Sequence, residues 1–171
     1  MGSSLVTDIG SVLSAGRPMS LDERVEVPPF SSFTFSQPAH VRLDLRRVDR
    51  GLEIGGTIDL AVVGPCGRCL EDVVVPMTVD VEERFDPPGG TSDPFGENNV
   101  LRGTDLDVAD LVRQLVTSAL PLTLTCGEGC RGLCDTCGRS KNEGGGCTCP
   151  PLMESRDHGE PQMENPAIQD T

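Results

Sequence analysis

Residues 41–85 read VRLDLRRVDRGLEIGGTIDLAVVGPCGRCLEDVVVPMTVDVEERF, and apolar side chains alternate with polar or small ones along three runs of this stretch. Strict alternation puts the apolar side chains on one face of a strand, as strands buried on one side require. The three apolar faces are Val41, Leu43 and Leu45; Leu52, Ile54, Ile58, Leu60 and Val62; and Val73, Val75, Met77, Val79, Val81 and Phe85. The stretch therefore predicts three consecutive antiparallel strands, a β-meander.

Short connections join these three strands. Residues 49–51, Asp-Arg-Gly, have the composition of a tight hairpin turn in which Gly51 supplies a positive φ. The second connection, residues 64–71, reads GPCGRCLE and therefore places Cys66 and Cys69 at a hairpin tip, outside the core.

A helix is expected after the meander. Apolar residues recur there at helical spacing, namely Val108, Leu111, Val112, Leu115 and Ala119. Thr104 is placed to cap this helix and Pro121 to end it, which gives one amphipathic helix over residues 105–120. We expect it to cover the apolar face of the sheet, since two or three strands cannot bury that face alone. Residues 5–9 and 21–27 are candidate edge strands.

The charge of the chain is strongly acidic and unevenly distributed. Of a net charge of -13, residues 70–110 contribute eleven acids against two arginines. Such a surface repels phosphate and disfavours broad binding to an RNA backbone. Residues 39–50 carry the opposite balance, and the candidates for a local RNA contact are Arg42, Arg46, Arg47 and Arg50. The alternative for these arginines is an ordinary solvated strand face.

Side chains suited to catalysis or nucleotide binding are scarce. The two histidines, His40 and His158, do not lie near a nucleophile in the sequence, and the single lysine, Lys141, leaves no phosphate-binding loop of the G-x-x-x-x-G-K type. The sequence therefore predicts a protein that is not an enzyme and has no small-molecule substrate. No signal peptide or stretch of membrane-spanning length is recognisable, so we expect a cytoplasmic protein without a membrane partner.

The cysteines are the most informative residues for function. The chain has eight, and six of them fall in CGEGCRGLCDTCGRSKNEGGGCTC, residues 126–149. In a reducing compartment, closely spaced cysteine pairs are metal ligands or redox centres more often than structural disulfides. Zinc prefers four thiolates in a tetrahedron, and a C-x-x-C turn offers two sulfurs to one ion.

Two sets of four ligands follow from the spacing. The first set is Cys66, Cys69, Cys126 and Cys130, and the second is Cys134, Cys137, Cys147 and Cys149, joined as in a zinc ribbon. Eight thiolates in two closed sets predict two structural zinc ions and leave no open position for catalysis. Cys130 can alternatively join the distal set and leave a mixed or partial site. Disulfides or a thiol redox relay remain the alternative to metal.

These patterns together define the expected fold class and domain organisation. The class is α+β, an antiparallel β-sheet or meander covered by one amphipathic helix, with a C-terminal zinc-ribbon-like appendage and a disordered tail. Residues 1–125 form the sheet and helix, with a mobile acidic loop at 86–99. Residues 126–149 form the cysteine-rich zinc-binding segment, and residues 150–171 form the disordered acidic tail.

Two segments resemble a known family. PCGRCLEDVVVPMTVDVEERF, residues 65–85, is similar to the C-x-R-C-L hairpin segment of the YceD family, the large ribosomal RNA subunit accumulation proteins of bacteria and plastids. LPLTLTCGEGCRGLCDTCGRSKNEGGGCTC, residues 120–149, is similar to the cysteine-rich end of many members. The resemblance covers roughly residues 40–150. The last four cysteines are not universal in that family, which suits a first site that can stand alone.

The resemblance implies a function that composition does not show. It implies a non-enzymatic role in the accumulation of large-subunit ribosomal RNA, with the pre-ribosomal large subunit as partner through the RNA, a basic ribosomal protein, or both. Two other classes remain open. One is a zinc-ribbon module for protein interaction away from ribosomes, and the other is a thiol redox sensor.

Overall fold

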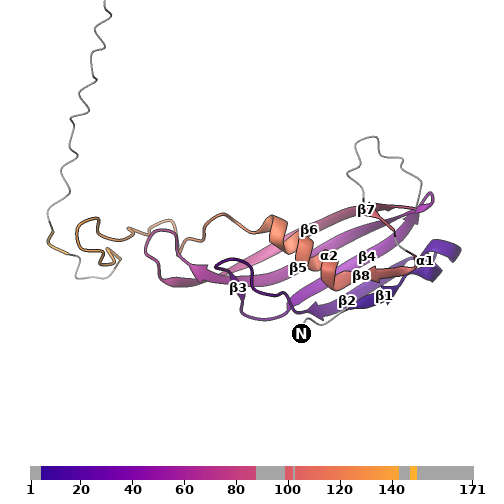
Figure 1. Ribbon diagram of the computed structural model, residues 1–171, viewed down its shortest axis with the longest axis horizontal. Helices are drawn as coiled ribbons and strands as arrows, with labels where there is room; N and C mark the ends of the chain where they lie inside the picture. The colour runs from indigo at the N-terminus through magenta and orange to yellow at the C-terminus, as the bar shows by residue number, and fades with distance from the viewer. Residues whose placement is uncertain (1–4, 88–98, 102, 143–146, 150–171) are drawn as a thin grey trace, which may run out of the picture.

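The computed structural model describes residues 5–87, 99–101, 103–142 and 147–149, and a long sheet forms its centre (Figure 1). In chain order the elements are β1 Val6–Asp8, α1 Gly10–Ala15, β2 Met19–Val25, β3 Thr34–Phe35, β4 Ala39–Val48, β5 Gly51–Pro65, β6 Asp72–Asp86, β7 Asn99–Val100, β8 Asp105–Asp107 and α2 Val108–Ala119. Of the loop predicted at 86–99, the two ends belong to strands β6 and β7, and residues 88–98 lie outside the described residues. The tail predicted at 150–171 also lies outside them.

The predicted meander is confirmed as β4, β5 and β6. The main sheet has the order β2-β4-β5-β6-β7, and β3 pairs with β5 beyond the end of β4. Leu45 is opposite Ile54, and Ile58 is opposite Val79, so the three predicted apolar faces lie on one side of the sheet. Among the described strands of this sheet, the pairings are antiparallel except that of β6 with β7. The edge strand predicted at 21–27 is present as β2, shifted two residues toward the N-terminus.

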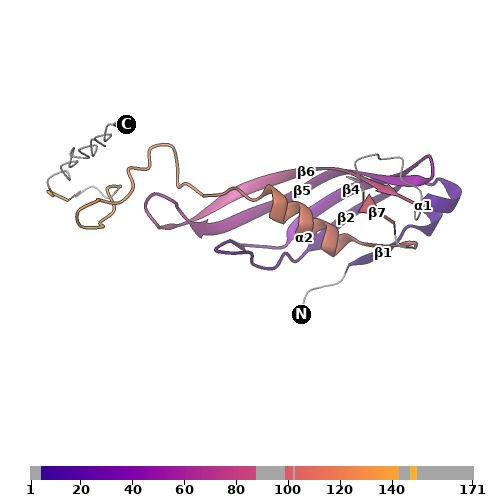
Figure 2. The same cartoon turned by 45° about the horizontal axis from the view of Figure 1, so that its top comes forward.

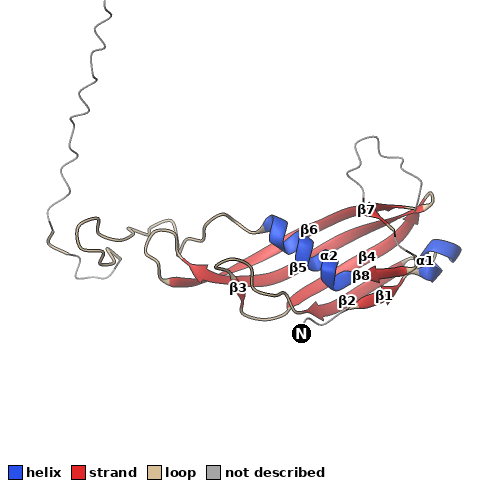
Figure 3. Cartoon of the chain, in the orientation of Figure 1, coloured by secondary structure: helices blue, strands red, loops and turns tan. Residues whose placement is uncertain are grey.

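The apolar face of the sheet is covered by α2, α1 and the small β1–β8 ribbon (Figures 2 and 3). Leu111 and Val112 are buried as predicted, whereas Val116 is buried in place of Ala119. The sequence predicts one helix, and the structure adds α1, which contributes the fully buried Val12 to the core. Six residues are too few for a helical period to show in the sequence.

The turn between β4 and β5 corrects the expectation for Gly51. The positive φ of this turn, 54°, belongs to Asp49. Gly51 is required for a different reason, because a Cβ atom there would lie 2.4 Å from the backbone oxygen of Phe85 on β6. The glycine therefore allows close approach of a neighbouring strand and does not supply the unusual backbone angle.

The start of α2 corrects the predicted cap. The N-cap is Asp107, whose side chain accepts a hydrogen bond of 2.9 Å from the backbone amide of Asp110. Thr104 cannot fill this position because β8, which pairs with β1, follows it before the helix begins. The helix ends at Ala119, shortly before Pro121, as predicted. Within the described residues, neither helix combines the length and the hydropathy needed to cross a lipid bilayer.

Asp107→Ala should destabilise the protein by about 1 kcal/mol, because the cap loses its acceptor and one amide in the first turn becomes unsatisfied. Urea unfolding followed by circular dichroism measures the change. Asp105→Ala is the matched control, since Asp105 is an exposed aspartate on the same strand, and its loss should stay within about 0.5 kcal/mol. Equal effects of the two substitutions would contradict the role of Asp107 as the cap.

Candidate metal centres

The first cysteine cluster is built where the tip of the β5–β6 hairpin meets the segment after α2. The tip is a tight turn, in which the amide of Cys66 donates to the oxygen of Glu71 at 2.8 Å. Beside it, the amide of Gly67 donates to the oxygen of Leu124 at 2.8 Å. The tip position of Cys66 and Cys69 is as predicted, and both side chains are buried there, at 0% and 4% exposed. The segment after α2 covers the tip and buries both side chains.

The four sulfur atoms of this cluster lie close together. Cys66 Sγ is 3.9 Å from Cys130 Sγ, and Cys69 Sγ is 3.8 Å from Cys126 Sγ. All four ligand atoms lie within 4.8 Å of one another. A zinc–sulfur bond of about 2.3 Å in a tetrahedron gives a sulfur–sulfur edge of about 3.8 Å, whereas a disulfide bond is about 2.05 Å long. The spacing therefore fits four ligands of one metal ion, and Cys130 groups with the proximal set.

Backbone amides surround the most buried sulfur. Cys66 Sγ accepts hydrogen bonds from the amides of Arg68 at 3.5 Å and Cys126 at 3.4 Å. The amides of Cys69, Arg68 and Cys126 lower the pKa of Cys66 to about 6. The pKa of Cys126 is raised to about 12, chiefly by its hydrogen bond with the thiol of Cys130. Thiolates packed this closely repel one another, and a divalent cation at their centre would remove that repulsion.

The second cluster lies in a small hairpin further along the chain. The sulfurs of Cys134, Cys137, Cys147 and Cys149 lie within 4.8 Å of one another. Cys134 is anchored from both directions, because its amide donates to Arg139 and its oxygen accepts from Gly138, each at 2.8 Å. The pKa of Cys134 is lowered to about 6, first by the thiol of Cys147 and then by the amides of Cys137 and Thr136. Both predicted groupings of four cysteines are thus close together in space.

Asn142 connects the two clusters. It lies between Cys137 and Cys147 of the second cluster, yet its Nδ2 donates to Cys130 Sγ at 3.5 Å and its Oδ1 accepts from the amide of Arg131 at 2.7 Å. The amide of Leu133, next to the second cluster, donates to the oxygen of Arg68 in the first at 3.1 Å. Sequence reasoning missed Asn142, since an asparagine in a Gly-rich loop carries no spacing signal. The contacts make the two clusters one connected unit.

The four candidate RNA-contact arginines do not form one stripe. Arg42 Nη2 pairs with Asp59 at 2.6 Å, and Arg46 pairs with Glu53, so each is matched by an acid on β5. Arg47 donates to the oxygen of Leu13 at 2.9 Å, near the end of α1. Arg50 is exposed in the β4–β5 turn. The structure thus separates Arg47 from Arg42 and Arg46, which occupy the opposite face of β4 from the core.

Comparison with known proteins finds curated relatives in mycobacteria. Uncharacterized proteins of Mycobacterium tuberculosis and Mycobacterium bovis are each 35% identical to this chain over 107 residues, which is 60% of this chain and 52% of theirs. One of Mycobacterium leprae is 31% identical over 108 residues, 60% of this chain and 49% of its own length. The chain therefore spans about half the length of the curated relatives it matches. No solved structure matches it.

A family match covers the larger part of the chain. The family described as large ribosomal RNA subunit accumulation protein YceD matches residues 54–165. The matched range includes most of β5, all of β6 and α2, and both cysteine clusters. These are the elements that build the first cluster, and the chain belongs to the YceD family.

Proposed function

We propose that this protein is a non-enzymatic factor for large ribosomal subunit biogenesis that supports accumulation of large-subunit ribosomal RNA and is stabilised by two structural zinc ions. The observation that carries the proposal is the family match over residues 54–165, because the family is named for a role in the accumulation of large-subunit ribosomal RNA. The proposed partner is the pre-ribosomal large subunit in the cytoplasm, contacted through its RNA, a basic ribosomal protein, or both. No catalytic step or small-molecule substrate is part of the role.

The chemistry of the two clusters supports zinc as the ion. Each cluster offers four thiolates at tetrahedral spacing, which is the ligand set of closed structural zinc sites. The first site would hold zinc through Cys66, Cys69, Cys126 and Cys130, and the second through Cys134, Cys137, Cys147 and Cys149. Since cysteine thiolates would occupy all four coordination positions of each ion, the ions would stabilise the fold and would not activate water.

Asn142→Ala should weaken metal retention at the first site without touching a ligand. Mutation of a group that hydrogen-bonds to a metal ligand typically lowers metal affinity about 10–100-fold. We therefore expect at least about tenfold faster release of one ion to a chromophoric chelator. Lys141→Ala is the matched control, because the Lys141 side chain makes a surface ion pair with Asp135. Equal release from both variants would remove Asn142 from the support of the site.

The charge of the protein favours a basic partner over bare RNA. The net charge is -13 before metal binding, and a zinc ion with four thiolates adds no positive charge overall. A basic ribosomal protein would be attracted to the acidic residues between 70 and 110. Arg50, in the β4–β5 turn, is the best placed of the four arginines for a local RNA contact, since Arg42 and Arg46 are already paired.

Density-gradient sedimentation of a cell lysate at low and high salt tests the function. Comigration of the protein with large-subunit precursors, lost at high salt, is the expected result, because charged contacts are screened. Arg50→Glu should weaken comigration if RNA is contacted there, and unchanged comigration would remove the RNA contact. Migration only as a free small protein in both salts would overturn the role on the ribosome.

The two alternative classes give different results. A thiol redox sensor requires labile cysteines, so purified protein that retains two zinc ions and resists oxidation would exclude it. A zinc-ribbon interaction module would hold zinc equally well but would not comigrate with ribosomal precursors.

We further propose that the chain has three parts: a sheet-and-helix part to residue 125, the metal-binding segment 126–149, and an acidic tail, 150–171.

A further inference from the structure

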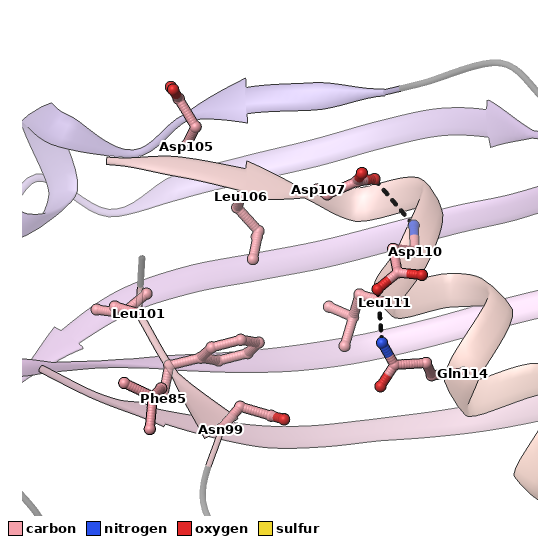
Figure 4. A pocket seen from close by; sticks show the side chains of 10 residues that line it. Phe85, Asn99, Leu101, Asp105, Leu106, Asp107, Asp110, Leu111 and Gln114 are labelled. Atoms are coloured by element: carbon pink, nitrogen blue, oxygen red, sulfur yellow. Dashed lines mark hydrogen bonds between the residues drawn. The ribbon is translucent and has the colours of Figure 1, made fainter. Parts of the chain in front are cut away.

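An apolar groove opens beside the first turn of α2, at the end of the sheet where β7 pairs with β6 (Figure 4). Its volume is about 250 Å³. The apolar side chains that line it are Phe85, Val100, Leu101, Leu106 and Leu111. Leu106 and Leu111 point toward Phe85 from the opposite wall (Figure 4). The floor is well packed, since Leu101, Leu106 and Leu111 are nearly buried, but Val100 at its edge is 50% exposed.

Carboxylates line one side of this apolar floor. Asp110 lies on the α2 side, where its carboxylate accepts hydrogen bonds from Arg113 at 2.5 Å and Gln114 at 2.6 Å, which lower the pKa of Asp110. On the opposite side the groove is lined by Asn99, whose Nδ2 donates to Glu83 at 2.9 Å. Two further carboxylates, Asp105 and Asp107, belong to β8 and line the same groove. The groove therefore combines an apolar floor with three carboxylates along its β8 and α2 side, of which Asp110 is paired with Arg113.

The charge of these carboxylates selects the chemistry of an occupant. A phosphate backbone would be repelled, and an acidic peptide would be repelled equally. The chain's own residues 88–98, which connect β6 to β7, include two acids and no lysine or arginine, so they lack the complementary charge. A segment with an apolar side chain between basic residues matches both features. Its apolar side chain is removed from water when it packs on the floor, and its cations face the carboxylates.

We propose that this groove is a docking site for a segment of a partner protein in which one large apolar side chain is flanked by lysine or arginine. The inference rests on the proposed function, in which a basic ribosomal protein is a partner, and assigns that contact to the groove. The groove lies at the end of the sheet opposite to the cysteine clusters, so docking leaves the metal centres accessible and intact (Figure 1).

Titration of the full, metal-loaded chain with synthetic peptides tests the proposal. The probes are a peptide with leucine between lysine and arginine residues, the same peptide with serine for leucine, and one with leucine between glutamates. Changes in backbone amide chemical shifts locate the bound peptide on the protein, and calorimetry measures its affinity. We expect saturable binding of the first, about tenfold weaker binding of the second, and none of the third, with shifts at Val100, Leu106 and Leu111.

Matched variants connect the binding to the groove. Asp110→Asn should weaken binding of the basic leucine peptide about threefold and reduce its dependence on salt. Val100→Ser should weaken it by removing apolar floor at a half-exposed position. Glu26→Gln makes the same change of net charge at an exposed position of the chain near β2 and should leave binding unchanged.

Several results would overturn the groove as the site. They are equal binding of the leucine and serine peptides, shifts confined to another face, binding of a second copy of this chain there instead, and equal affinity of Asp110→Asn and Glu26→Gln. The proposed function fails separately. If the wild type does not comigrate with ribosomal precursors but the groove binds the basic leucine peptide, the ribosomal role is lost and the docking site stands. If the wild type comigrates but the peptide does not bind, only the groove is lost.

Discussion

Cys66→Ser should remove one zinc equivalent and destabilise the entire sheet-and-helix part. Cys66 is fully buried, and its backbone pairs with that of Leu124, where the tip of the β5–β6 hairpin meets the segment after α2. The first site joins segments almost sixty residues apart, and structural zinc binds with about 10–16 kcal/mol that becomes folding free energy. We expect a loss of about 4 kcal/mol or more, and a Tm lower by about 10 °C.

Cys149→Ser is the matched control for this effect. It removes a ligand of the second cluster, whose four cysteines all follow residue 133 and hold no strand of the sheet. We expect loss of one zinc equivalent with a change in Tm of the sheet below about 3 °C. Metal content by mass spectrometry and calorimetric unfolding measure both variants. Equal losses of stability, or unchanged zinc content in Cys66→Ser, would contradict the assignment of the first cluster as the structural centre.

The same comparison explains why the two clusters differ in what they stabilise. The first draws two ligands from the tip of the β5–β6 hairpin and two from beyond α2, so a metal ion bound there would fix the helix against the strands. The second draws all four ligands from one short segment, so a metal ion bound there would order only that segment. The hydrogen bonds of Asn142 and Leu133 connect the second cluster to the first, so order in the second segment also supports the first site. Loss of the second ion should therefore affect the first site mainly through Asn142.

The parts of the fold that were predictable have a strict period. Alternation along β4, β5 and β6 left one arrangement in which all apolar faces meet, and the registers confirm it. The cysteine groupings were predictable in part, because two C-x-x-C pairs each supply half of a ligand set, but the sequence left Cys130 open between the two sets. A strict repeat was sufficient for the strands, whereas the place of Cys130 depended on tertiary contacts.

The parts that were missed depend on contacts between distant segments. The cap of α2 moved from Thr104 to Asp107 because β1, far away in the sequence, pairs with residues 105–107. Arg47 on β4 donates to the backbone oxygen of Leu13 near the end of α1, a contact between distant segments that takes it out of a basic stripe. Burial of Cys66 depends on the segment around Leu124. None of these partners leaves a periodic signal in the sequence.

Gly56→Ala should be the most damaging single substitution on the sheet that leaves the cysteines intact. Gly56 has a φ of 150°, and a Cβ atom there would lie 2.0 Å from the backbone oxygen of Arg42 on β4. This neighbour is backbone, so relief requires breaking the β4–β5 ladder, and we expect a loss of about 3–5 kcal/mol. Gly55→Ala is an adjacent control, because its Cβ would meet only the oxygen of Val81 at 3.8 Å. That control should be neutral or stabilising by up to about 1 kcal/mol, since alanine restricts the unfolded chain. Denaturant unfolding of both variants decides the matter: a Gly56→Ala protein as stable as Gly55→Ala would show that β4 and β5 do not approach this closely.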